Sequence, residues 1–213
     1  MTSIFIRNAR NLQRLTLTSL DYVQLSFVLI LTELPNLCWL QLDRCEIGTE
    51  LQEYIRIVEP GHIPAAPVLR HVRLACPSSG TDAIEIAPWG VLTICGSSLQ
   101  RLDLDMFRFA CPERADWPHY TRPVRALRHL GVWSLEGDHI PQLIEFLRGS
   151  APLALNRFDI HDPELQMDEL KALIGQLKEL GPSLSIVDVR LRDAALLAEL
   201  QVSYPSIDFR DSH

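Results

Sequence analysis

Histidine is the residue type in this chain best suited to acid–base or metal chemistry, and its seven histidines are spread along the sequence. His129 and His161 both fall in segments of alternating apolar and polar residues, and His161 lies two positions beyond Asp159. Neighbouring strands would bring these three side chains together, which is weak support for a metal or acid–base site. His71 and His129 occupy equivalent positions with Arg101 between them, too far apart to bind one metal ion.

The motifs that usually accompany catalysis or cofactor binding are missing from the sequence. It contains no GxSxG, HExxH, P-loop glycine string, GxGxxG or paired zinc-type CxxC. We therefore expect no enzyme activity, no cofactor and no metal. The remote alternative is a small hydrolase or metal site built on residues 105–126, which would require a convergent pocket of His and Asp beneath that segment.

A repeated apolar triplet of the form L-x-x-L-x-L organises the whole chain. Successive triplets begin 25, 32, 30, 28, 28 and 29 residues apart, a period typical of leucine-rich repeats. The triplets are Leu12/Leu15/Leu17, Leu37/Leu40/Leu42, Leu69/Val72/Leu74, Leu99/Leu102/Leu104, Leu127/Leu130/Val132, Leu155/Phe158/Ile160 and Leu184/Val187/Val189.

Each triplet lies in a segment of period two, which predicts a strand, and apolar stripes at helical spacing follow at 47–58 and 140–147. One repeat cannot bury its own leucines, so neighbouring repeats must share a core. We therefore predict an α/β fold. It is a right-handed leucine-rich-repeat solenoid, with a curved parallel sheet on its concave side and helices and loops on its convex side. Residues 1–213 would form a single domain of about seven to eight repeats.

Between the sixth and seventh triplets the sequence predicts its clearest helix. We expect Asp162 to cap it, Pro163 to occupy its first turn and Gly181 to end it. A last short helix is expected from Asp193, followed by a strand within residues 204–209.

Two segments, 75–88 and 105–126, lack a helical stripe and are predicted to be loops. The sequence also begins in the middle of a repeat and shows no polar capping unit at either end. It therefore resembles a piece of a longer repeat protein, or one whose end is covered by a partner.

Side chains that alternate with the apolar ones form three columns on the open face of the predicted sheet, with neighbours about 4.8 Å apart. The third, fifth and seventh repeat positions give Arg14/Trp39/His71/Arg101/His129/Arg157/Ile186, Thr16/Gln41/Arg73/Asp103/Gly131/Asp159/Asp188 and Thr18/Asp43/Ala75/Asp105/Trp133/His161/Arg190. Tryptophan and arginine are enriched among residues that dominate binding energy. We predict a partner-binding surface formed by Trp39, His71, Arg101, Asp103, His129, Trp133, Arg157 and Asp159.

The alternative for this face is a solvated ladder without a binding role. Arg101 could pair with Asp103, and Arg157 with Asp159, each pair contributing little to stability. In this alternative the tryptophans would lie flat on neighbouring strands. Single carboxylates such as Asp103 and Asp105 are expected to be surface charge. A structural role, with self-association through uncapped ends or convex helices, is the second functional hypothesis.

Composition narrows the class of partner. The net charge of −7 and pI of about 5.5 argue against general nucleic-acid binding. No signal peptide and no apolar run near the ~20 residues of a membrane span is visible. Five cysteines without CxxC spacing predict reduced thiols, with Cys45 capping the inner turn of its repeat. We expect an intracellular protein, cytoplasmic or nuclear, that binds another protein and neither nucleic acid nor membrane.

The motifs LPNLCWLQLDRC (34–45), SLQRLDL (98–104) and ALRHLGV (126–132) resemble leucine-rich repeats. Their irregular spacing, Pro-x-Leu starts and long insertions are most similar to fungal F-box proteins with leucine-rich repeats. That resemblance implies substrate recognition for a ubiquitin ligase, with an N-terminal F-box binding the ligase adaptor. No F-box is recognisable here, so an adaptor is an expected partner only if a longer chain carries one.

Overall fold

The computed structural model describes residues 9–19, 30–45, 66, 68–75, 92, 98–105, 124–135, 137, 140–161, 165–189 and 194–211. The strands within these ranges are β1 (Arg14–Thr18), β2 (Trp39–Asp43), β3 (His71–Ala75), β4 (Arg101–Asp105), β5 (His129–Trp133), β6 (Arg157–His161), β7 (Ile186–Val189) and β8 (Asp208–Arg210). The helices are α6 (Ile140–Arg148), α7 (Met167–Leu180) and α8 (Ala194–Ser203).

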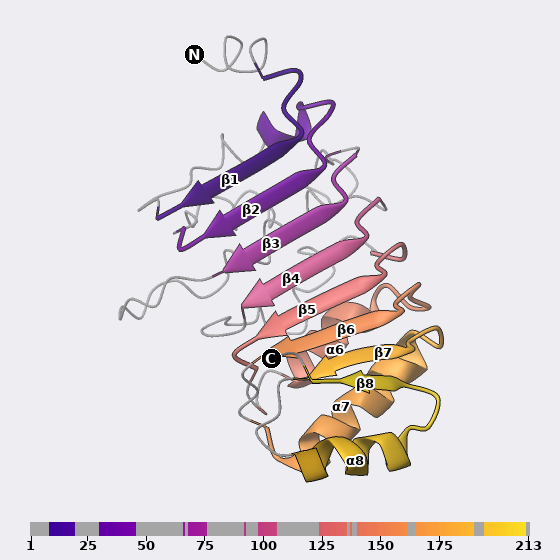
Figure 1. Cartoon of the computed structure of the whole chain (residues 1–213). Helices are drawn as coiled ribbons and strands as arrows, with labels where there is room; N and C mark the ends of the chain where they lie inside the picture. Colours follow the sequence, from indigo (N-terminus) through magenta and orange to yellow (C-terminus); the bar gives the residue numbers. More distant parts are fainter. Residues whose placement is uncertain are drawn as a thin grey trace.

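The strands form one open parallel sheet in which each strand pairs with the next along the chain, from β1 to β8 (Figure 1). Their register matches equivalent repeat positions, so that Arg14 pairs with Trp39, Trp39 with His71, and His71 with Arg101. The predicted parallel sheet of repeated strands is therefore confirmed, and the third and fifth columns form continuous rows of paired residues across it. The seventh column is paired from Thr18 to Ala75 and from Asp105 to His161, and its last member, Arg190, lies outside the described residues.

The backbone repeats just before each strand as well. The carbonyl of Gln13 accepts hydrogen bonds from the N–H groups of both Cys38 and Trp39, and the carbonyl of Cys38 accepts from Arg70 and His71. The same double acceptance continues at Arg70, Gln100, Arg128 and Asn156. One local conformation thus recurs at each step from β1 to β7, which keeps these strands in register.

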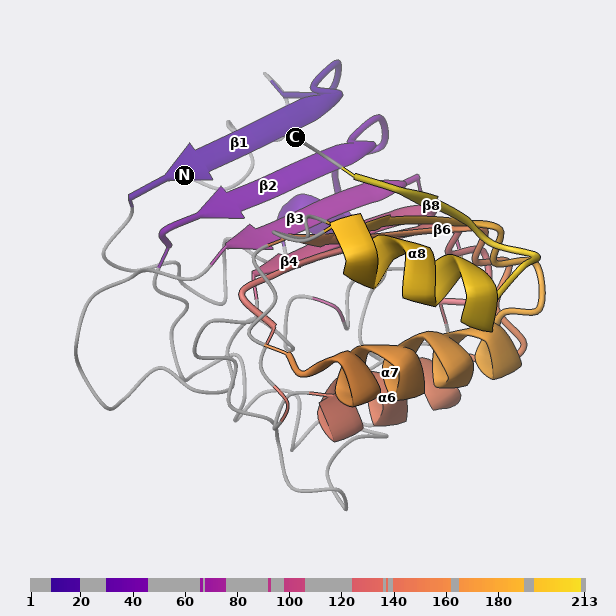
Figure 2. The same cartoon turned by 60° about the horizontal axis from the view of Figure 1, so that its bottom comes forward.

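The apolar triplets line the face of the sheet that is turned toward the helices. Leu40, Leu102, Leu130 and Phe158 are fully buried in one continuous core. Helix α6 adds its predicted stripe to that core, and α7 packs beside α6 (Figure 2). Burial of these side chains is the main favourable contribution to folding, which accounts for the repeated leucines by packing alone.

The predicted start of helix α7 is wrong, whereas its predicted end is confirmed. The helix begins at Met167, and the N–H of Gln166 donates to the side chain of Glu169 at 2.8 Å. A glutamate reaching back to the cap N–H satisfies a donor that the helix leaves open, so Asp162 is too far upstream to cap it. At the other end Gly181 follows the last turn, and its N–H donates to the Leu177 carbonyl.

Several residues that leave the strands adopt left-handed backbone angles. Ser19, Arg44 and Ser134 have φ of 55°, 52° and 51°, and each directly follows a strand. The Arg44 N–H still donates to the Ala75 carbonyl, so the ladder extends one residue past the strand. Beside this turn Cys45 is buried, and its thiol donates to the carbonyls of Leu17 and Asp43, as predicted for a residue that caps the inner turn.

The expected last helix and last strand are present as α8 and β8. Other predictions fall on residues outside the described ranges: the stripe at 47–58, the loop positions 76–88 and 106–123, and the capping residues Asp162, Pro163 and Asp193.

Candidate functional site

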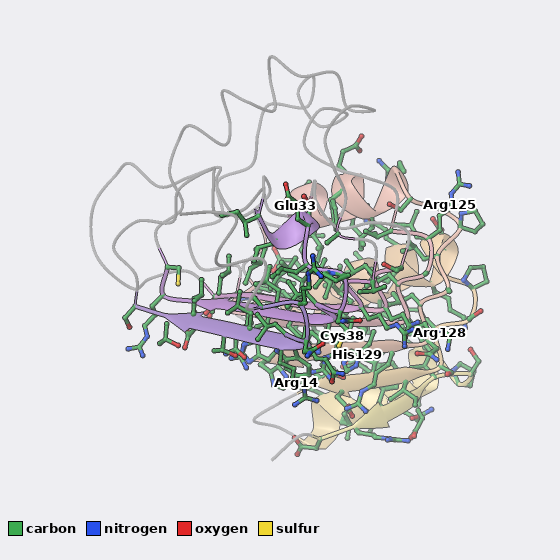
Figure 3. All side chains as sticks on the ribbon, turned by 90° about the horizontal axis from the view of Figure 1, so that it is seen from above. Arg14, Glu33, Cys38, Arg125, Arg128 and His129 are labelled. Atoms are coloured by element: carbon green, nitrogen blue, oxygen red, sulfur yellow. The ribbon has the colours of Figure 1, made fainter. Side chains whose placement is uncertain are left out.

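The eight residues predicted to bind a partner all lie on strands β2 to β6 and share the face of the sheet that points away from the leucine core. We call this surface the open face. Figure 3 shows Arg14 and His129 on this side of the sheet, with Glu33 and helix α6 on the opposite side. The alternation of side chains along each strand therefore separates the core from a polar surface rich in arginine, histidine and aspartate.

Three of the predicted residues form a compact ionic group on β3 and β4. The Asp103 carboxylate lies 2.6 Å from His71 Nε2 and accepts a hydrogen bond from Arg101 Nε at 2.9 Å. The Asp103 side chain is only 3% exposed. The expectation that this carboxylate is surface charge is therefore wrong, because His71 and Arg101 cover and neutralise it.

A second group repeats this arrangement two strands further on. His129 Nε2 lies 2.5 Å from the Asp159 carboxylate, and Arg157 Nε donates to the same carboxylate at 2.8 Å. Arg157 also reaches Asp188 on β7. In each group a histidine reaches diagonally to an aspartate on the next strand, where an arginine two positions earlier holds it.

These contacts change the acidity of the buried carboxylates. Burial by itself raises the pKa of Asp103, but hydrogen bonds from His71 and Arg101 outweigh it and leave the pKa below its ordinary value. The same competition at Asp159, with His129 and Arg157 as partners, lowers the pKa to about 2. Both groups are therefore anionic at neutral pH and hold fixed positions on the open face.

Asp188 behaves in the opposite way although it also contacts Arg157. Its burial and the neighbouring Asp159 carboxylate raise its pKa, and these effects exceed the attraction of Arg157. The guanidinium of Arg157 is shared between two acids: Nε donates to Asp159, and a terminal nitrogen donates to Asp188.

Trp39 lies between two basic side chains at the N-terminal end of the sheet. Its ring centroid is 3.7 Å from that of His71, and the Arg14 guanidinium carbon lies 4.8 Å from the ring centroid. Cations over an indole ring are attracted by its negative face. The stack therefore fixes the orientation of a half-buried tryptophan and links β1, β2 and β3.

Trp133 forms a related stack across β3 to β6. His161 stacks on its ring at 4.7 Å, while the Arg73 guanidinium carbon lies 5.1 Å from the ring centroid. Gly131 makes room for this packing, because a Cβ there would lie 2.4 Å from an Asp103 oxygen and 3.1 Å from the Trp133 ring. A gap in the fifth column thus lets groups from β3 and β5 meet above β4 and β5.

The structure brings the predicted residues together only in part. His129 contacts Asp159, as expected, whereas His161 contacts Trp133. His71 contacts Asp103, whereas His129 contacts Asp159. Among the described residues no group of three or more His, Cys, Asp or Glu side chains is placed to hold a metal ion. The proposed 105–126 site falls almost wholly outside the described ranges.

Arg73 belongs to the fifth column of the open face but is not among the eight residues predicted to bind a partner. Its Nε is buried and has no hydrogen-bond partner, a feature that no other buried side-chain nitrogen or oxygen shares within the described part of the chain. The signal available in the sequence was a basic residue in a column that is otherwise polar or acidic.

Comparison with known proteins does not assign the chain to a family: no protein-family model matches it, and no curated protein is significantly similar to it. The helices within the described ranges are also too short or too polar to cross a lipid bilayer.

Proposed function

We propose that this chain is an intracellular leucine-rich-repeat module, a right-handed solenoid that binds another protein on the open face of its sheet. The observation that carries the proposal is the placement of Trp39 and Trp133. Both tryptophans are partly exposed and held by stacking on the face that the core does not use. Aromatic side chains already fixed in one orientation lose little conformational entropy on binding.

The ionic groups support the same function. Asp103 and Asp159 are each held by a histidine and an arginine, so Arg101 and Arg157 lie in defined positions with 40% of each side chain exposed. Arginines ordered in this way present the rest of their planar guanidinium groups to a partner. Substrate selection for an F-box-type ubiquitin ligase is a specific form of this function, with adaptor binding depending on an F-box elsewhere in a longer chain.

The test compares proteins captured from an extract by the wild type, Trp39→Ala and Trp133→Ala. We expect each tryptophan variant to weaken capture of specific partners by more than about tenfold, as is typical of residues that dominate an interface. Arg148→Ala is the matched control, because Arg148 is exposed on α6, on the other side of the sheet. The Arg148→Ala variant should capture the same partners as the wild type.

Cross-linking mass spectrometry on the captured complexes then locates the contact. Cross-links should fall near the open face, and thermal unfolding should show that each variant is folded. Identical partners and cross-links for all variants, with the contact elsewhere, would contradict the proposal.

Self-association is a second candidate function, favoured by the edges of the sheet. β1 has no strand partner on its outer side among the described residues, and Leu15 and Leu17 are only partly buried. Open strand edges favour pairing with another chain. Light scattering coupled to size exclusion should show concentration-dependent multimers if this is the function, and Leu15→Lys should dissolve them.

A further inference from the structure

One basic side chain on the open face departs from the pattern of its neighbours. Arg101 and Arg157 each donate to a buried carboxylate, whereas Arg73 has a buried Nε without a partner. A buried donor of a charged group that makes no hydrogen bond is costly, because it has lost water and gained nothing in return. The Arg73 side chain as a whole is only partly buried, so the exposed part of its guanidinium is a candidate for contact with something outside the chain.

The carboxylate nearest to Arg73 in the sheet is already occupied. Asp103 lies opposite Arg73 in register, but its oxygens are held by His71 and Arg101. Arg73 extends instead toward the Trp133 ring, two strands away. Asp103 therefore leaves the Nε of Arg73 without a hydrogen-bond partner.

The stack on Trp133 leaves the guanidinium suited to one kind of ligand. Contact with an indole uses the flat face of a guanidinium, and the N–H donors of the group lie in its plane, at its edges. Donors arranged in this fork match the two oxygens of a carboxylate. Arg14 on Trp39 offers a second group of the same type, two strands from Arg73.

We propose that Arg73, held against Trp133, binds a carboxylate side chain of an acidic segment in a partner protein, with Arg14 on Trp39 as a second contact for the same segment. This inference rests on the proposed function, because it names the chemistry of the partner that the open face binds. The partner segment would carry aspartates or glutamates at a spacing that spans β1 to β3.

A protein carboxylate fits this surface better than a nucleic acid does. The anionic groups Asp103 and Asp159 lie among the arginines, and the whole chain carries a net charge of −7. A continuous phosphate backbone would pass over these anions, whereas an acidic segment can place single charges at Arg73 and Arg14 and avoid them. The charge pattern therefore selects separate acidic side chains.

The experiment measures binding of short poly-L-glutamate by tryptophan fluorescence and calorimetry, using the full chain. We expect Arg73→Gln to weaken this binding by about tenfold or more, the size of effect typical of losing a charge-assisted hydrogen bond. Arg73→Lys should be intermediate, because it keeps the charge and loses the planar fork. Arg148→Gln removes one positive charge on the other side of the sheet and should bind as the wild type does.

Thermal unfolding of the same variants separates a binding role from a structural one. Because Arg73 Nε has no hydrogen-bond partner, Arg73→Gln loses only the stack on Trp133 and should lower the melting temperature less than Arg101→Gln, which removes a partner of buried Asp103. A large loss of stability in Arg73→Gln would overturn the proposal. So would unchanged poly-L-glutamate binding in that variant, or no binding by the wild type.

Controls with other polyanions distinguish the ligand class. A single-stranded oligonucleotide that binds as tightly as poly-L-glutamate, and does so through Arg73, would overturn the assignment to protein carboxylates. If the tryptophan variants lose their partners while Arg73→Gln binds poly-L-glutamate normally, the interaction face stands and this inference falls. If instead Arg73→Gln loses poly-L-glutamate binding while both tryptophan variants keep their protein partners, the carboxylate site is supported and the proposed function is contradicted.

Discussion

At the scale of single residues, the open face depends on close packing between unlike groups. Gly131 is the clearest case, since an Asp103 oxygen and the Trp133 ring occupy the space where a side chain would lie. Asp103 cannot move without disturbing His71 and Arg101, both of which contact it. Its carboxylate thus joins the ionic group to the tryptophan stack.

Replacing Gly131 should therefore destabilise the protein. We expect Gly131→Ala to lower the free energy of unfolding by about 1–3 kcal/mol, the usual cost of forcing extra atoms into a packed site. Urea unfolding measures the change. Gly149→Ala is the control, because its Cβ would come no closer than 3.7 Å to the Phe146 carbonyl oxygen. Equal stability for both variants would show that Asp103 moves freely.

Acid should weaken the second ionic group over a defined range. The pKa of Asp159 falls from 3.8 to about 2 on folding, so its ionised form stabilises the protein above pH 3.8 and this contribution disappears as the pH drops through about 2. The difference corresponds to about 2 kcal/mol. The gap in unfolding free energy between wild type and Asp159→Asn should therefore narrow between pH 4 and pH 2.

The comparison for this pH series is Asp208→Asn. Asp208 pairs with Arg210 at the exposed edge strand β8, where an ion pair contributes little. The difference in unfolding free energy between Asp208→Asn and the wild type should be small at every pH. A gap for Asp159→Asn that stays constant down to pH 2 would contradict the lowered pKa.

At the scale of elements, short local hydrogen-bond patterns fix the register of the strands and the first residue of α7. Strand register follows from the carbonyls that accept two N–H groups each, and the start of α7 follows from Glu169. The helix thus begins where its cap N–H finds an acceptor, several residues after the proline that the sequence suggested. The hydrogen bond between the Gln166 N–H and the Glu169 side chain fixes this boundary, because it satisfies a donor that the first turn leaves open.

Removing the Glu169 carboxylate should loosen the first turn of α7. We expect Glu169→Ala to lower the unfolding free energy by about 0.5–2 kcal/mol, the range for losing a helix cap. Amide hydrogen exchange should show faster exchange at Gln166 while Leu173 and Leu177, buried in the core, stay protected. Glu179→Ala, near the other end of the helix, serves as the control and should leave exchange at Gln166 unchanged.

At the scale of the whole molecule, one core runs behind the sheet from repeat to repeat. Leu130 on the central strand β5 is fully buried, whereas Leu15 on the outermost strand β1 is only partly buried. A repeat in the middle of the stack has neighbours on both sides, and a terminal repeat has one. The contribution of equivalent leucines should therefore depend on their position in the stack.

A pair of matched truncations tests this dependence. Leu130→Ala should lower the free energy of unfolding by about 2–5 kcal/mol, because it leaves a cavity in a packed core. Leu15→Ala should cost clearly less, since part of that side chain already contacts water. Calorimetry or urea unfolding would report both values. Equal costs would show that the outermost repeat is as well packed as the central one.

The repeat pattern in the sequence was enough to predict the parallel sheet, the buried triplets and the three columns of the open face. Period-two alternation assigns each side chain to one face, and a regular repeat places equivalent residues in register, so both follow from local rules. The repeat pattern did not determine which side chains of neighbouring columns contact one another. Neighbouring columns are so close that a long side chain such as Arg73 or Arg157 reaches several acids or rings. Only the three-dimensional packing, with the gap at Gly131 and with Asp103 already held by His71, decided that Arg73 extends to Trp133 and keeps an unpaired donor.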